Sequence, residues 1–132
     1  MDYIKWDDSY SVGINLIDNQ HKKLIRILNK VIEHSEMDVR SKVVAEVLTE
    51  MTSYASYHFE SEEKYLVKLG KEELDLHRKE HQFFLKETAE FCFETMNNKQ
   101  TLPKEVKVFL RRWLLNHILK SDMKLKNLKI DE

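Results

Sequence analysis

The chain is poor in the residues that make turns. Its 132 residues include two glycines and one proline. A β-rich fold needs many tight turns, and glycine and proline supply most of them. The composition therefore argues against a sheet-based fold and favours a few long helices.

Cysteine and long apolar runs are scarce as well. The sequence has one cysteine, Cys92, and a lone thiol cannot form an internal disulfide, which fits a reducing compartment. No apolar run is long enough to span a membrane. The first residues lack the basic-then-apolar pattern of a signal peptide. These observations predict a cytoplasmic protein without a membrane partner.

An excess of charge of one sign is also lacking. The 22 Lys and Arg residues nearly balance 23 Asp and Glu residues, which leaves a net charge of -1. Proteins that bind nucleic acid or a membrane surface usually carry a basic excess or a basic face. We therefore expect no nucleic-acid partner. The length and the 42% hydrophobic content predict one domain with a real core.

Apolar periodicity divides the chain into an arm and four helices. Residues 1–17 have no clean helical period and are expected to form an extended arm. Asp18 is a candidate N-cap of the first helix, and Gly70 is a candidate C-terminal stop of the second. The expected helices cover about 18–37, 40–69, 73–97 and 102–126. Short connections predict an all-α, up-down-up-down four-helix bundle with an extended N-terminal arm.

Five of the six histidines and two acids fall on the expected inward faces of these helices. They are His21 in the first helix, His58 and Glu62 in the second, His77 and His81 in the third, and His117 and Asp122 in the fourth. Because neighbouring helices of such a bundle are antiparallel, all seven should lie at similar depth. A buried polar cluster of this kind is costly unless something binds it.

The residue types predict a metal centre. Imidazole and carboxylate suit iron, manganese or zinc better than calcium or magnesium, and seven ligands are too many for one tetrahedral zinc. Residues four apart on an α-helix differ by roughly 40° in direction, so they can bind one ion or reach two. Asp122 follows His117 by five and should be rotated by roughly 140°, which disfavours chelation of the same ion but lets the carboxylate reach between two.

Other interpretations compete with a metal centre. A single histidine on an apolar face, such as His21, is more often a hydrogen-bonded core residue, and a His–Glu pair four apart is more often a surface pair. A metal-free bundle that binds a partner protein is the simplest alternative. A ferritin-like oxidase is rejected because no histidine here has a glutamate three residues before it. His34, the sixth histidine, lies off the apolar face and is expected to be exposed.

The same residues resemble a known family. The pattern H…HxxxE…HxxxH…HxxxxD is met in full, and Val12-Gly13-Ile14 and the segments around His21 and His117 are similar as well. The chain as a whole resembles the single-domain bacterial hemerythrins of the hemerythrin family. It departs from them at residues 69–74, where family members often carry a proline and an aromatic residue.

The resemblance implies a non-haem di-iron site that binds O2 reversibly, for storage, delivery or sensing. His77, His81 and His117 would hold one iron. His21 and His58 would hold the other, which keeps an open position where O2 binds as hydroperoxide. Glu62 and Asp122 would bridge the irons together with an oxo or hydroxo group. The residues that would line an apolar O2 pocket are Leu24, Phe59, Trp113, Leu114 and Ile118.

A di-iron redox enzyme acting on peroxide, nitric oxide or O2 is the alternative. No acid or base stands out beside the open iron in the sequence, so we favour a binding protein that is not an enzyme. The expected partners are O2, with nitric oxide and small anions as further ligands. Metal identity follows from the resemblance more than from the ligands, because imidazole and carboxylate also accept manganese or zinc.

Overall fold

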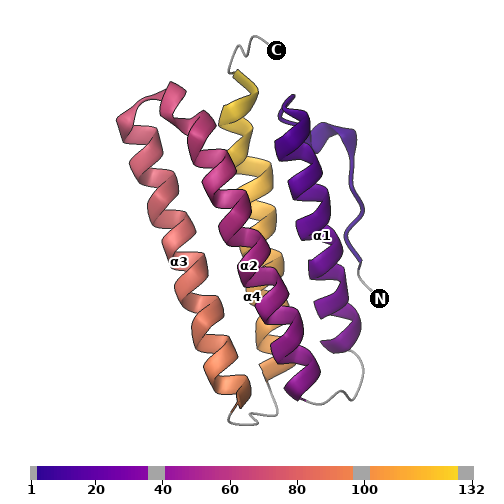
Figure 1. Cartoon of the computed structure of the whole chain (residues 1–132). Coiled ribbons are helices and arrows are strands. Elements are labelled where there is room, and N and C mark those ends of the chain that lie inside the picture. Colours follow the sequence, from indigo (N-terminus) through magenta and orange to yellow (C-terminus); the bar gives the residue numbers. More distant parts are fainter. Residues whose placement is uncertain (1–2, 36–40, 97–101, 128–132) are drawn as a thin grey trace.

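Four helices form the body of the protein, as the computed structural model shows (Figure 1). The model describes residues 3–35, 41–96 and 102–127. The helices are α1 (Asn15–Ser35), α2 (Ser41–Leu66), α3 (Lys71–Met96) and α4 (Leu102–Asn116). They run alternately up and down, and the described residues contain no strand. The predicted all-α up-down-up-down bundle is therefore confirmed.

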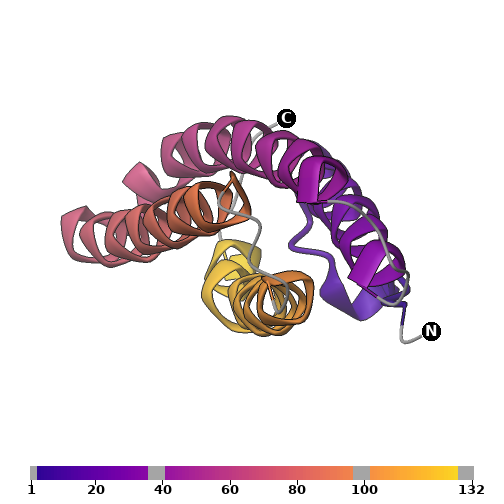
Figure 2. The same cartoon turned by 90° about the horizontal axis from the view of Figure 1, so that it is seen from below.

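The helices pack as an arc with one helix inside it. Seen along the bundle, α3, α2 and α1 form the arc, and α4 lies against its concave side (Figure 2). The contact between α2 and α3 is the most extensive, whereas α3 and α4 meet over a smaller surface. Apolar side chains from all four helices fill the interior, among them the fully buried Leu28, Leu48, Phe84 and Leu110. No described helix combines the length and the apolar character that a membrane crossing requires.

An N-terminal arm lies along α1 (Figure 1). Asn29 fixes its start, because the Asn29 side chain accepts from the N–H of Ile4 and donates to its carbonyl, both at 2.9 Å. Asp18 fixes its end by accepting from the Val12 N–H at 2.9 Å and from the Ser11 hydroxyl. The arm contains one short 3₁₀ turn, η1 (Asp8–Tyr10).

The first helix begins earlier than expected. The α1 helix starts at Asn15, and the N–H of Asp18 donates to the Ile14 carbonyl at 2.9 Å. Asp18 therefore lies within the first turn, and the prediction that it is the N-cap is wrong. Its carboxylate accepts hydrogen bonds from the arm, and its negative charge also suits the positive end of the helix dipole.

The connection from α2 to α3 is a tight turn at Gly70. The chain leaves α2 through a 3₁₀ segment, η2 (Val67–Leu69), and Gly70 follows with φ of +105°. A positive φ is easily reached only by glycine, so Gly70 ends the segment as expected. Helix α3 then begins at Lys71, two residues before the expected 73. The expected helix boundaries at residues 37, 40 and 97 lie outside the described residues, as does the side chain of His34.

The fourth helix changes its hydrogen-bonding pattern near its end. After Asn116 the chain forms a π-helical turn, η3 (His117–Ser121), and then a 3₁₀ segment, η4 (Asp122–Asn127). The expected α-helix to residue 126 is thus α-helical only to residue 116. π-turns inside helices often occur at functional sites.

Candidate metal centre

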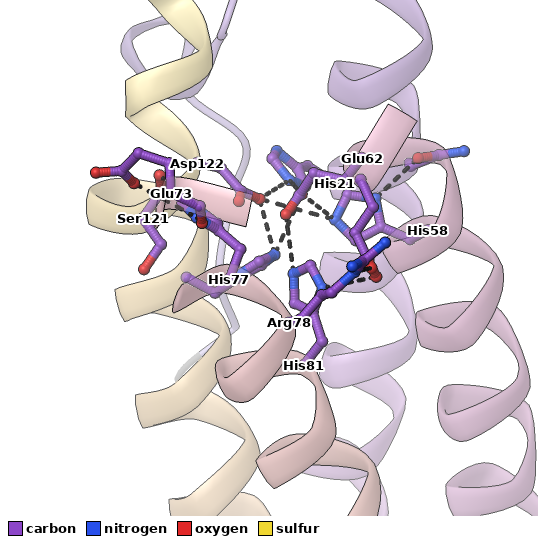
Figure 3. A network of polar contacts seen from close by, with 12 residues as sticks. His21, His58, Glu62, Glu73, His77, Arg78, His81, Ser121 and Asp122 are labelled. Atoms are coloured by element: carbon purple, nitrogen blue, oxygen red, sulfur yellow. Dashed lines mark hydrogen bonds and ion pairs between the residues drawn. The ribbon is translucent and has the colours of Figure 1, made fainter. Parts of the chain in front are cut away.

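Five of the expected ligand side chains converge in the interior (Figure 3). Each offers one ligand atom, these atoms lie within 4.8 Å of one another, and all five residues are buried. They are His21, His58, Glu62, His117 and Asp122. They come from α1, α2 and the end of the fourth helix, which places groups up to 101 residues apart in one cluster.

The π-turn decides how Asp122 joins this cluster. The N–H of Asp122 donates to the His117 carbonyl, which is an i to i+5 bond. Such a turn places side chains five apart on the same side of the helix, and Oδ2 of Asp122 lies 2.8 Å from Nε2 of His117. The expectation that Asp122 is rotated away from His117 is wrong, because it assumed α-helical geometry at this point.

The two carboxylates of the cluster each meet several histidines. Oδ2 of Asp122 lies 2.7 Å from Nε2 of His21. Oε2 of Glu62 lies 2.9 Å from Nε2 of His58 and 3.3 Å from Nε2 of His117. Each carboxylate is thus shared by imidazoles from different helices, which is the arrangement that a bridging ligand requires.

His77 and His81, the remaining two expected ligands, lie at the α3 side of the cluster (Figure 3). Nε2 of His81 lies 3.0 Å from Oε1 of Glu62, so this ring reaches the cluster directly. Nε2 of His77 lies 3.0 Å from the Ser121 carbonyl oxygen, next to Asp122 in the chain. The two rings are 6.2 Å apart between centroids and are both buried.

Several buried polar atoms of the cluster have no hydrogen-bond partner among the described residues. They are Nδ1 of His21, Nε2 of His58, Oε2 of Glu62, both ring nitrogens of His117 and Oδ1 of Asp122. Nε2 of His58 and Oε2 of Glu62 are close, but their bonding directions are not aligned for a hydrogen bond. Unpaired polar atoms are expensive in a core. Ligand atoms that converge in the core, several of them without a hydrogen-bond partner, fit a metal ion, and the residue types fit iron, manganese or zinc.

The charges of the cluster balance one another. Burial opposes ionisation of Glu62, but the charges of His117 and His58 outweigh it and hold the Glu62 pKa well below its ordinary value. Burial would lower the pKa of His117, but Asp122 and Glu62 raise it well above the ordinary value. Burial and the charge of Glu62 oppose ionisation of Asp122, but His117 and His21 outweigh them and lower the Asp122 pKa. Burial would lower the pKa of His21, but Asp122 and Glu62 raise it. Two buried carboxylates therefore require positive charge, from protons or from metal ions.

Hydrogen-bond partners behind the histidines did not emerge from the sequence. Nδ1 of His58 lies 2.8 Å from Oε1 of Gln20, and the Gln20 amide donates to the Ser61 hydroxyl at 3.0 Å. Nδ1 of His77 lies 2.9 Å from the Glu73 carbonyl, and Nδ1 of His81 lies 3.3 Å from Oε2 of Glu63. Gln20 and Glu63 each stand beside an expected ligand in the chain, which is the one signal that the sequence offers for them.

Aromatic side chains of the apolar core pack against the cluster. The expected pocket residues Leu24, Phe59, Leu114 and Ile118 are at most 2% exposed and share one core cluster, against which Trp113 packs. Trp113 stacks on His117 with ring centroids 4.7 Å apart. Phe59 stacks on His81 at 3.9 Å and also meets His58 at 5.7 Å. The two aromatic rings thus lie mainly against His81 and His117.

Comparison with known proteins relates the chain to one family. Residues 12–128 match the family described as Hemerythrin HHE cation binding domain. A bacteriohemerythrin of Clostridium acetobutylicum is 34% identical, over 89% of this chain and 94% of the relative. A bacteriohemerythrin of Pseudomonas paraeruginosa is 30% identical, over 92% of this chain and 78% of the relative.

The fold also matches a solved structure. A crystal structure of wild-type hemerythrin superposes with a TM-score of 0.81 at 24% identity, over 92% of this chain and 93% of that one. At this level of identity the likeness concerns the fold alone, and it agrees with the four-helix architecture described above.

Proposed function

The chain belongs to the hemerythrin family, and from this membership we propose that it binds O2 reversibly at a non-haem di-iron centre. Family membership and a buried cluster of histidines and carboxylates support a metal site. Iron as the metal and O2 as the ligand are the finer part of the proposal. Storage, delivery and sensing are all uses of the same binding reaction.

The family resemblance suggests how the seven expected ligands would divide between two metals. His77, His81 and His117 would hold one iron, His21 and His58 would hold the other, and Glu62 and Asp122 would bridge them. When bound, each of the two irons can be oxidised and reduced reversibly by one electron. The unequal number of histidines would leave the iron at His21 and His58 with the open position.

The observation that carries the proposal is the convergence of five buried ligand groups. Their ligand atoms lie within 4.8 Å of one another, and several have no other partner among the described residues. His21, His58 and His117 already present their ligand atoms together with the two carboxylates. Nε2 of His77 lies 3.0 Å from the Ser121 carbonyl oxygen and would have to leave that contact to bind a metal. The two anionic carboxylates offset much of the charge of two cations in a dry interior.

The apolar wall would determine which molecules reach the centre. We propose that Leu24, Phe59, Trp113, Leu114 and Ile118 line the O2 pocket. Four of these side chains are buried and Trp113 is partly buried. An apolar wall does not disfavour neutral O2, whereas anions and water lose their hydration on entering it. The chain would thereby protect a reduced centre from irreversible oxidation.

Visible absorption of the iron-loaded, reduced protein tests the proposal. Spectra are recorded under argon, in air and again under argon, with iron content measured in parallel. We expect about two irons per chain and charge-transfer bands that appear with O2 and vanish when it is removed. Immediate conversion to a stable oxidised form without such bands would contradict reversible binding. Turnover of peroxide, nitric oxide or O2 with an electron donor would then favour the redox enzyme.

A further inference from the structure

One expected metal ligand, His81, is held on two sides by other residues. Phe59 stacks on the face of its ring, with centroids 3.9 Å apart and planes within 5° of parallel. Its inner nitrogen, Nε2, faces Glu62 at 3.0 Å, and its outer nitrogen, Nδ1, lies 3.3 Å from Oε2 of Glu63. A carboxylate only accepts hydrogen bonds, so whichever ring nitrogen carries the proton donates it to the carboxylate beside it. A metal bound at Nε2 would need the lone pair of that nitrogen, which leaves the proton on Nδ1, where it donates to Glu63.

Glu63 is itself held in place. Nε of Arg78 donates to Oε1 of Glu63 at 2.8 Å, while the other oxygen of the same carboxylate faces His81. Arg78 and His81 come from α3 and lie at the same side of the cluster (Figure 3). Glu63 comes from α2. The side chain of Glu63 is 23% exposed and that of Arg78 is 51% exposed, so the chain of contacts leads from the surface to the buried ring.

The partners of the other outer nitrogens are different. Nδ1 of His58 meets the neutral amide oxygen of Gln20, and Nδ1 of His77 meets the backbone carbonyl of Glu73. Among these three histidines, His81 is the one that faces a carboxylate within hydrogen-bond distance. The Glu73 carboxylate lies 3.7 Å from Nδ1 of His77, beyond hydrogen-bond distance, so both anionic groups lie beside the metal expected at His77 and His81.

We propose that Glu63, clamped by Arg78, is a positioning residue for His81. Glu63 fixes the proton of His81 on Nδ1, orients the ring and adds negative charge beside one metal. The inference rests on the proposed function in that it takes His81 to be a metal ligand. Hydrogen-bond partners behind metal-binding histidines commonly change metal affinity by about 10–100-fold when removed.

A purely structural role is the competing explanation. The contact between Arg78 and Glu63 also joins α2 to α3, and an exposed ion pair of that kind contributes little to stability. A cavity of about 250 Å³ lies beside it, lined by both residues together with His81 and Glu60. Without Glu63, a water in this cavity could accept from Nδ1 but would supply no charge. Metal affinity and the state of the His81 proton separate the two explanations.

The test uses zinc, because zinc-loaded protein is diamagnetic and gives sharp NMR signals. Zinc is titrated into metal-free wild type and variants in competition with a chelator, and histidine side chains are observed by ¹H–¹⁵N NMR. Glu63→Leu removes acceptor and charge, and Glu63→Gln keeps an acceptor but removes the charge. Arg78→Gln leaves the carboxylate without its clamp. Glu60→Gln, which removes a charge from the same cavity, is the matched control.

We expect Glu63→Leu to bind one of two zinc ions roughly tenfold more weakly and to lose the protected Nδ1–H signal of His81. Glu63→Gln should keep that signal while part of the affinity is lost, and Arg78→Gln should have a smaller effect than Glu63→Leu. Glu60→Gln should match wild type. If the wild type binds two ions and Glu63→Leu behaves like Glu60→Gln in both measurements, the positioning role is overturned. If the wild type binds neither zinc nor iron, the di-iron proposal and the positioning role of Glu63 both fail.

Discussion

Asp122 and His117 are brought together by the backbone between them. They are five positions apart in the chain, yet Oδ2 of Asp122 lies 2.8 Å from Nε2 of His117, because residues 117–121 form a π-turn. In a regular α-helix a spacing of five would turn the two side chains roughly 140° apart. The same carboxylate oxygen also lies 2.7 Å from Nε2 of His21. The irregular turn thus lets one carboxylate join α1 to the end of the fourth helix.

Replacing this carboxylate should disable the centre without unfolding the protein. Asp122→Asn keeps the shape of the side chain but removes the charge and one strong ligand. Because the residue is itself a proposed ligand, we expect zinc or iron affinity to fall by at least roughly the 10–100-fold seen for outer partners. Chelator competition measures the loss. The control Asp75→Asn removes an exposed acid of α3 and should leave the affinity unchanged. Equal affinities in the two variants would contradict the assignment of Asp122.

The arm depends on Asp18. Its carboxylate accepts from the Val12 N–H at 2.9 Å and from the Ser11 hydroxyl. Asp18→Ala leaves the buried Val12 N–H without its partner, which typically costs about 1–3 kcal/mol. We expect faster amide hydrogen exchange at Val12, measured by NMR, while the amides of α3 keep their protection. Unchanged exchange at Val12 would show that packing alone holds the arm.

The periodicity of apolar residues is sufficient to predict the helices and their inward faces. Apolar positions three and four apart identified the inner faces of the helices, and short connections implied the antiparallel order, so the histidines and acids could be assigned to the interior. The confirmed four-helix fold follows from these two regularities. Both are local properties of the chain that packing reinforces.

The parts that periodicity missed depend on tertiary contacts. The residue type of Asp18 suits an N-cap, whereas its hydrogen bonds to the arm are decided by where the arm lies. The π-turn at His117 has no local signal in residues 117–121, since nothing in their types favours an i to i+5 bond. Gln20 contacts His58, 38 positions away, and Glu63 contacts His81, 18 positions away, in both cases on another helix. No pattern along one helix contains that information.

The core around Leu48 should control the stability of the metal-free protein. Leu48 lies in α2 and is fully buried, whereas Leu76 in α3 is 47% exposed. Leu48→Ala removes apolar contacts and leaves a cavity, so we expect a loss of about 2–5 kcal/mol in the free energy of unfolding. Leu76→Ala should change it by no more than about 0.5 kcal/mol. Urea unfolding followed by circular dichroism measures both. Similar losses of stability in the two variants would mean that Leu48 is not packed in the core.

Cys92 should react slowly at neutral pH. Burial raises the pKa of its thiol, and the thiolate is the reactive form. At a given pH below the pKa, less thiolate is present than for an ordinary cysteine, so alkylation by iodoacetamide should be slower. Limited access slows the reaction at every pH, but the pH at which the rate levels off reports the pKa alone. We expect levelling at a higher pH in the folded protein than in guanidinium. The same levelling pH in both states would contradict the shift.

Metal removal should weaken the fold as a whole, because the unpaired atoms lie in the core. Oε2 of Glu62 and both ring nitrogens of His117 are buried without hydrogen-bond partners among the described residues, which is costly until a cation binds them. A ligand that binds only the folded state stabilises it by about 2.7 kcal/mol at a free concentration of 100 times its Kd. We therefore expect excess zinc to raise the urea midpoint of the wild type relative to chelator-treated protein. Asp122→Asn should lose most of that increase. An equal increase in the variant would show that the metal binds elsewhere. No increase in the wild type would show that zinc does not stabilise the folded cluster.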